Sequence, residues 1–277
     1  KDSATKITIG EGRRLSTTTA REGPHSGPVS EKHAAIQKAY QKPSYRYLVL
    51  GILTTVYVSN FVDRQVINVL AQPIIDDLNI SDGQFGMLSG LAFAFIYTTL
   101  AVPIARWADI SNRRDIVAAS VAIWSVMTAL CGAAQSFAQL FLARFGVGIG
   151  EAGGSPPSHS IVSDIFPAEQ RATALSIYSL GVYGGILVGT VGGAYLVQYF
   201  DWRTAFVVVG MPGILLALVV RFVVKEPPRG MAEARKDVAP PGFFKVMGFL
   251  WERKSFRHLS FACALHAFVT YGMGHVM

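Results

Sequence analysis

The sequence predicts an all-α membrane protein that crosses the bilayer several times. Of its 277 residues, 51% are hydrophobic and only 16% are charged, whereas an average soluble domain carries about 25% charged residues. The apolar residues gather in runs that contain no Asp, Glu, Lys or Arg: 83–105, 116–143, 172–200, 204–220 and 258–277. Because about 20 apolar residues let one helix cross the hydrocarbon core, several such runs indicate a polytopic helical protein.

Six complete spans and the start of a seventh follow from these runs. Residues 1–45 are polar and rich in scattered Gly, Ser, Thr and Pro, so we expect a disordered cytoplasmic tail. A bundle over 46–224 is expected to hold spans at 47–71, 85–107, 115–135, 139–160, 172–199 and 204–224. Residues 225–257 are expected to form a cytoplasmic linker, in which PPGFF (240–244) begins a stretch typical of an amphipathic helix. Residues 258–277 begin the seventh span.

The distribution of basic residues supports this division and sets an orientation. Lys and Arg concentrate in residues 1–46, in alternate short connections, and in residues 221–257. The opposite connections are poor in them, and 71–84 contains acidic residues but no basic one. This positive-inside pattern predicts a multi-pass protein of the bacterial inner membrane with a cytoplasmic N-terminus. It also accounts for the net charge of +7 without nucleic acid as a partner.

The segment RFGVGIGEAGGSPPSHS (144–160) contains the pattern GxGxxG, which is typical of dinucleotide-binding turns. That fingerprint requires a preceding strand and a soluble βαβ unit, whereas these glycines lie inside a predicted span. Glycines also recur every fourth residue in span four, at 146, 150 and 154, and in span five, at 181, 185, 189 and 193. Such faces let two membrane helices approach closely. We therefore expect tight helix packing here, either static or permitting helices to slide, and no nucleotide site.

Several motifs resemble those of the major facilitator superfamily. The segment ARWADISNRR (105–114) is similar to the family loop signature G-x-x-x-D-R-x-G-R-R and matches it at Asp109, Arg113 and Arg114. Span four, the link DIFPAEQRATAL (164–175) and the sequences DWRTAF and KEPP around span six also resemble family motifs. NFVDRQVINVL (60–70) and GEAGGSPP (150–157) are similar, more narrowly, to the spinster-like transporters.

This resemblance implies a fold of twelve transmembrane helices arranged as two six-helix halves. The chain then supplies the N-terminal six-helix bundle and a truncated seventh helix, and the missing C-terminal half is its partner within the fold. In that fold spans one and four line a central cavity. The resemblance also implies that Asp109, Arg113 and Arg114 latch a cytoplasmic gate and stabilise the outward-open state. Arg113 and Arg114 are alternatively explained as positive-inside anchors.

Four ionisable residues are expected inside the bilayer: Asp63 and Arg64 in span one, and Arg144 and Glu151 in span four. Charged side chains at this depth are costly and usually face a water-filled path or one another. Arg144 and Glu151 are two turns apart, about 10 Å, and share a helix face. Because spans one and four line the cavity of the resembled fold, we expect all four residues to form one network.

Each member of this network has an expected role. Glu151 is the candidate for the coupling proton, because burial raises a carboxyl pKa while a nearby arginine lowers it. Asp63, next to Arg64, is expected to keep its charge. The resemblance to spinster-like transporters also implies proton coupling by Asp63, Arg64 and Glu151. Arg144 is the candidate anchor for an anionic substrate group, with Arg64 and Glu151 beside it. The alternative is a permanently ionised network that only positions the helices.

These observations predict a secondary transporter that works by alternating access. The expected partners are the lipid bilayer, a proton and an amphipathic or lipid-like organic anion. A carrier of small aromatic or sugar acids is one alternative, and a non-transporting membrane fragment or sensor is another. We find no nucleophile–base arrangement and no ligand spacing typical of a metal site, so we expect neither an enzyme nor a cofactor.

Overall fold

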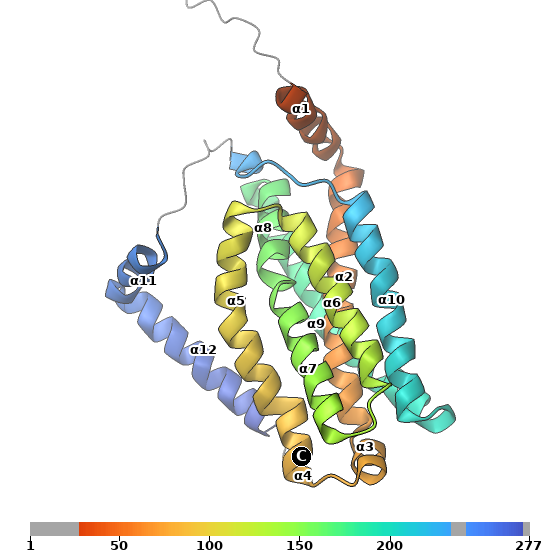
Figure 1. Cartoon of the computed structure of the whole chain (residues 1–277). Coiled ribbons are helices and arrows are strands. Elements are labelled where there is room, and N and C mark those ends of the chain that lie inside the picture. The colour runs from red at the N-terminus through yellow and green to blue at the C-terminus, as the bar shows by residue number, and fades with distance from the viewer. Residues whose placement is uncertain (1–27, 234–241, 274–277) are drawn as a thin grey trace, which may run out of the picture.

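The computed structural model describes residues 28–233 and 242–273, and every regular element within these ranges is a helix (Figure 1). This confirms the predicted all-α class. The α-helices are α1 (Pro28–Gln41), α2 (Pro43–Val69), α3 (Ala71–Leu78), α4 (Asp82–Gly86), α5 (Ala92–Ile110), α6 (Arg113–Cys131), α7 (Phe137–Ala152), α8 (Ser155–Ile165), α9 (Ala168–Tyr199), α10 (Trp202–Val223), α11 (Phe243–Glu252) and α12 (Lys254–Met273). A π-helical turn, Met87–Leu91, joins α4 to α5, and a 3-10 turn spans Met231–Glu233.

The long helices run side by side as one bundle (Figure 1). Helix α2 packs along α9, and α6 packs between α10 and α7. Helices α11 and α12 contact each other and lie outside this bundle. Within the described ranges, four stretches are long and apolar enough to cross a membrane: Asp82–Ile110, α6, α9 and α10. The chain is therefore a multi-pass integral membrane segment.

The fourth predicted span is divided in two. Helix α7 ends at Ala152, α8 begins at Ser155, and Gly153 and Gly154 lie between them. Pro156 and Pro157 occupy the first turn of α8 and have no N–H to bond to the preceding turn, which ends one helix and starts the next. The predicted single span over 139–160 thus becomes a broken helix that continues to Ile165.

The sequence-based boundary at residue 45 is wrong for part of the predicted tail. Residues 28–41 form α1, and α2 already begins at Pro43. Proline is favoured in the first helical turn because its missing N–H would be unpaired there anyway. The rest of the tail, residues 1–27, lies outside the described residues, as do residues 234–241 of the linker. The predicted helix after PPGFF appears as α11, which begins at Phe243.

The glycine-lined faces pack as close helix contacts. On α7, a Cβ added at Gly150 would lie 2.6 Å from the backbone nitrogen of Trp124 in α6. On α9, Gly181, Gly185, Gly189 and Gly193 are all buried against α2. Both contacts are helix–helix packing, which accounts for the GxGxxG pattern without a nucleotide.

Candidate functional site

The four intramembrane ionisable residues meet between α2 and α7. Arg64 donates from Nε to Oε2 of Glu151 over 2.7 Å. Asp63 lies close enough to Glu151 and Arg144 for each charge to act on it. The structure therefore brings together all four residues that the sequence singled out, and it identifies Arg64 as the direct partner of Glu151.

This cluster is removed from solvent in the described bundle. Asp63, Arg144 and Glu151 are 2%, 3% and 1% exposed, whereas the side chain of Arg64 is 19% exposed. Among the described residues, no hydrogen-bond partner is found for Oδ1 of Asp63, Nε and Nη1 of Arg144, or Oε1 of Glu151. Buried polar atoms are seldom left without a partner in folded proteins. The two carboxylate oxygens can thus accept a proton or a hydrogen bond from water, and the two Arg144 nitrogens can donate to water or an anion.

Aromatic rings surround the guanidinium of Arg64. Its Cζ lies 5.0 Å from the ring centroid of Phe61, 5.0 Å from that of Phe93 and 4.8 Å from that of Tyr97. The Cζ of Arg144 lies 5.7 Å from the Phe93 centroid. Helix α5 therefore closes the site from a third side and contacts both arginines through one ring.

The cluster contains two arginine cations and two carboxylates, so its net charge is zero when all four side chains are ionised. Adding one proton to a carboxylate leaves a net positive charge in a site shielded from water. Opposite charges interact far more strongly there than in bulk solvent. The arrangement is therefore chemically able to hold a proton and an anion at the same time.

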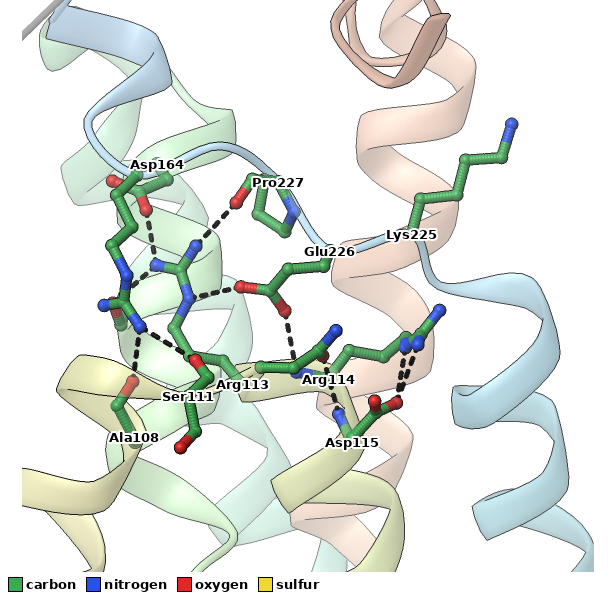
Figure 2. Close-up of polar contacts among 12 residues, drawn as sticks. Ala108, Ser111, Arg113, Arg114, Asp115, Asp164, Lys225, Glu226 and Pro227 are labelled. Atoms are coloured by element: carbon green, nitrogen blue, oxygen red, sulfur yellow. Dashed lines mark hydrogen bonds and ion pairs between the residues drawn. The ribbon is translucent and has the colours of Figure 1, made fainter. Parts of the chain in front are cut away.

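A second polar cluster lies at the end of the bundle where α6 begins (Figure 2). Arg113 is only 1% exposed and forms ion pairs with Asp164 of α8 and with Glu226, whose Oε1 lies 2.8 Å from Nε of Arg113. It also donates to Oγ of Ser160 and to the carbonyl of Pro227, each over 2.8 Å. One guanidinium thus joins α6, α8 and the segment after α10.

Further contacts hold this segment to the bundle. The backbone N–H of Arg114 donates to Oε2 of Glu226 over 2.8 Å. Arg229 donates to the carbonyls of Ala108 and Ser111, at 2.7 and 2.8 Å, where α5 ends (Figure 2). These carbonyls have no partner within the helix, and a cation is favourable at a helix C-terminus.

The three residues expected to form a gate are not all engaged in this cluster. Arg113 and Arg114 are part of it, and Nη2 of Arg114 lies 2.7 Å from Oδ1 of Asp115. Asp109 is exposed and lies 3.9 Å from Arg106, one turn earlier in α5. Its side chain therefore remains accessible at the surface of the described bundle.

The opposite end of the bundle has its own ion pair. Arg203 lies 2.7 Å from Asp77 of α3 and donates to the carbonyl of Ala134 over 3.2 Å. The hydrogen bond from Arg203 holds the pKa of Asp77 below its usual range. Arg203, in the first turn of α10, thus ties this helix to α3.

Sequence reasoning underestimated several contributors to these sites. Phe93 and Tyr97 look like ordinary packing residues, and only the fold shows that they contact Arg64. Glu226 and Arg229 lie in a linker with many charges, so their roles have no sequence signal beyond the KEPP motif. This motif brings both the Glu226 carboxylate and the Pro227 carbonyl to Arg113.

Comparisons with known proteins agree with this architecture. The family model described as Major Facilitator Superfamily matches residues 53–277. An MFS-type efflux pump of Mycolicibacterium smegmatis is 37% identical over 66% of this chain and 42% of its own. Protein spinster homolog 1 of Xenopus tropicalis is 31% identical over 82% of this chain and 44% of its own. A probable galactarate/D-glucarate transporter of Bacillus subtilis is 30% identical over 72% of this chain and 45% of its own.

A solved structure shares the fold. A bacterial homologue of the human lysosomal transporter Spinster, in an inward-facing and unoccupied conformation, superposes with a TM-score of 0.68 and 40% identity. The match covers 84% of this chain and 54% of that chain. The chain thus spans about half the length of the relatives that it matches.

Proposed function

Because the chain belongs to the major facilitator superfamily, we propose that the full-length protein is a secondary transporter that couples proton movement to transport of an organic anion. The observation that carries this proposal is the buried Arg64–Glu151 pair, with Asp63 and Arg144 beside it. The family supports alternating access of the central site to the two sides of the membrane.

The proposed coupling follows from the charges of this cluster. While Glu151 is ionised, it occupies Arg64 and the site is neutral. When Glu151 takes up a proton, Arg64 loses its partner, and Arg64 and Arg144 together outweigh Asp63. The excess positive charge then attracts the anionic group of a substrate, which the planar guanidinium of Arg144 grips in a bidentate manner. In this proposal Asp63 keeps the charge expected from its place next to Arg64 in the sequence.

The leading substrate class is an amphipathic or lipid-like anion. The resemblance to spinster-like transporters supports this class, and so does the combination of two arginines with aromatic rings at one site. A small sugar acid is the second candidate, which the Bacillus subtilis relative favours. Thermal stability of the full-length protein, measured with lysolipids and with sugar acids, separates them, because a bound ligand raises the unfolding temperature.

The Arg113 cluster is proposed to belong to the gate on the cytoplasmic side. There Arg113 and Arg114 fix the segment after α10 to the bundle. The exposed carboxylate of Asp109 remains accessible to the second half of the transporter. In this proposal it contacts that half in the outward-open state.

The charge distribution supports an inner-membrane location with α1 in the cytoplasm. Cysteine introduced at Asn79 should then react with an impermeant thiol reagent in intact cells, whereas cysteine at Gln41 should not. Both positions are exposed in the structure, so their accessibility depends on the side of the membrane. The reverse labelling pattern would invert the orientation.

The function is tested by uptake into proteoliposomes that contain the full-length protein and carry a pH gradient. Wild-type protein should accumulate the substrate found in the stability screen, and the rate should follow pH. Glu151→Gln should fold but lose this pH dependence, while Glu169→Gln, at an exposed position in the first turn of α9, serves as the control. Absence of uptake by wild-type protein with every stabilising ligand would favour a non-transporting sensor or fragment instead.

A further inference from the structure

We propose that Phe61, Phe93 and Tyr97 form a cation cage that positions Arg64 beside Glu151 and thereby sets the pH at which Glu151 takes up its proton. This inference rests on the proposed function, because it assigns positioning residues to the same proton-coupling site. It concerns three aromatic side chains that belong to α2 and α5 and that carry no titrating role themselves.

All three rings of the cage converge on Arg64, and the ring centroid of Phe93 also lies 5.7 Å from Cζ of Arg144. Each of the three ring centroids lies between 4.8 and 5.0 Å from its Cζ, within the range in which a ring attracts a cation. Phe93 and Tyr97 are one turn apart on α5 and stack on each other, with centroids 5.9 Å apart and planes 19° apart. Their stacking restricts the orientation of both rings independently of Arg64. Phe93 also faces Gly148, where an added Cβ would lie 3.5 Å from its ring.

Arg64 needs such positioning because its side chain is long and partly exposed. Of the four charged residues in the site, it is the one that reaches toward solvent. Without the rings, its guanidinium would be free to turn toward water and leave Glu151. The cage holds the cation in place by a force that does not depend on the charge of Glu151. Arg64 is thus held in the same position before and after the proton binds.

The charged and titratable groups of the site come from several helices. Arg64 and Asp63 belong to α2, Tyr97 to α5 and Arg144 to α7, and Cys131 of α6 lies near Asp63 and Arg144. Of these, Arg64 alone forms a hydrogen bond with Glu151 in the described residues. A neighbouring cation favours the ionised carboxylate. Loss of the cage therefore moves proton uptake by Glu151 toward higher pH.

The experiment is an infrared pH titration of the full-length protein in lipid bilayers, with the proton as its only ligand. The protonated carboxyl band that is present in wild type and absent from Glu151→Gln reports on Glu151. Phe93→Leu and Tyr97→Leu should each move the midpoint of this band upward by about one pH unit, a tenfold change in proton affinity. Tyr97→Phe keeps the ring but removes the hydroxyl that bonds to Arg64, so it should move the midpoint less than Tyr97→Leu does. Phe95→Leu, at a position 73% exposed on the same helix, is the matched control and should leave the midpoint unchanged.

Failure of the cage and failure of the proposed function give different results in this titration. If no band is lost in Glu151→Gln, then Glu151 is not the proton site and the proposed function fails. If that band is present but both leucine variants keep the wild-type midpoint, the cage is wrong and proton coupling by Glu151 stands. A shift in Tyr97→Phe as large as in Tyr97→Leu would also overturn the cage, because the ring would then be irrelevant. If Tyr97→Leu does not fold, Phe93→Leu alone tests the cage, because an unchanged midpoint in that variant overturns it.

Discussion

The charged residues of the site could be picked out from the sequence alone, but which of them contact one another became visible only in the fold. The sequence placed Arg144 and Glu151 on one face of a helix, and both are buried in the structure. Two helical turns separate them, about 10 Å, which is too far for direct contact. Glu151 instead bonds Arg64, which comes from a helix 87 residues earlier in the chain. Such a partner depends on how two helices pack, and no local spacing reveals it.

Arg113 provides a test at the level of one residue. It is fully buried and makes two ion pairs and two further hydrogen bonds, so Arg113→Ala leaves Asp164 and Glu226 without their cation. Removing one member of a buried ion pair costs about 3–5 kcal/mol. We expect Arg113→Ala to lower the unfolding free energy by about 3 kcal/mol, measured by thermal unfolding of the purified protein.

Arg221 is the matched control, because its side chain is exposed and its Nε lies 3.5 Å from Asp115. Arg221→Ala should change stability by less than about 0.5 kcal/mol, as surface ion pairs contribute little. Equal losses for the two variants would mean that the Arg113 cluster is not a structural clamp. Anchoring by positive charge alone would then explain both residues.

At the scale of helices, hydropathy and charge predicted six spans, and four stretches of the described residues are long and apolar enough to cross a membrane. Details of backbone geometry were missed. The break between α7 and α8 depends on Pro156 and Pro157, which were visible in the sequence but were placed inside one continuous span. The short helix α3 was not expected, because it occupies a connection between spans. Helix α1 was missed because polar composition alone suggested disorder.

The glycine face of α9 gives a prediction at this scale. A Cβ at Gly185 would press on Cβ of Phe61 and lie 2.6 Å from the carbonyl oxygen of Val58, so α9 would have to move away from α2. Overpacking of this kind costs about 1–3 kcal/mol. Gly185→Ala should therefore lower the unfolding temperature, as measured by thermal unfolding of the purified protein.

Gly192 lies on the same helix, but an added Cβ meets nothing within 4 Å. Gly192→Ala should be neutral or stabilising, because alanine favours the helix by about 1 kcal/mol over glycine. If Gly185→Ala were equally harmless, the close approach of α2 and α9 would not depend on the glycine face. The four glycines on this face of α9 would then not be needed for the contact between the two helices.

At the scale of the whole molecule, the sequence predicted the family, because its motifs are short and local. It also predicted that spans one and four meet, because their charged residues are visible in the sequence and the resembled fold brings these spans together. It did not predict how α5 closes the site, since Phe93 and Tyr97 carry no signal that distinguishes them from packing residues. It also did not predict that the segment after α10 is clamped at Glu226 and Arg229. Those contacts join residues more than 100 positions apart, and only folding brings them together.

The central claim is that substrate and proton bind to one linked site through Glu151. If a proton promotes substrate binding, then substrate must promote proton binding by the same factor. The most direct measurement is proton uptake by the full-length protein in weakly buffered detergent solution when the substrate from the stability screen is added. Wild type should take up as much as one proton per molecule near the midpoint of its pH profile, and Glu151→Gln should take up none while still binding substrate. Equal proton uptake by wild type and Glu151→Gln, or none by wild type, would contradict the account.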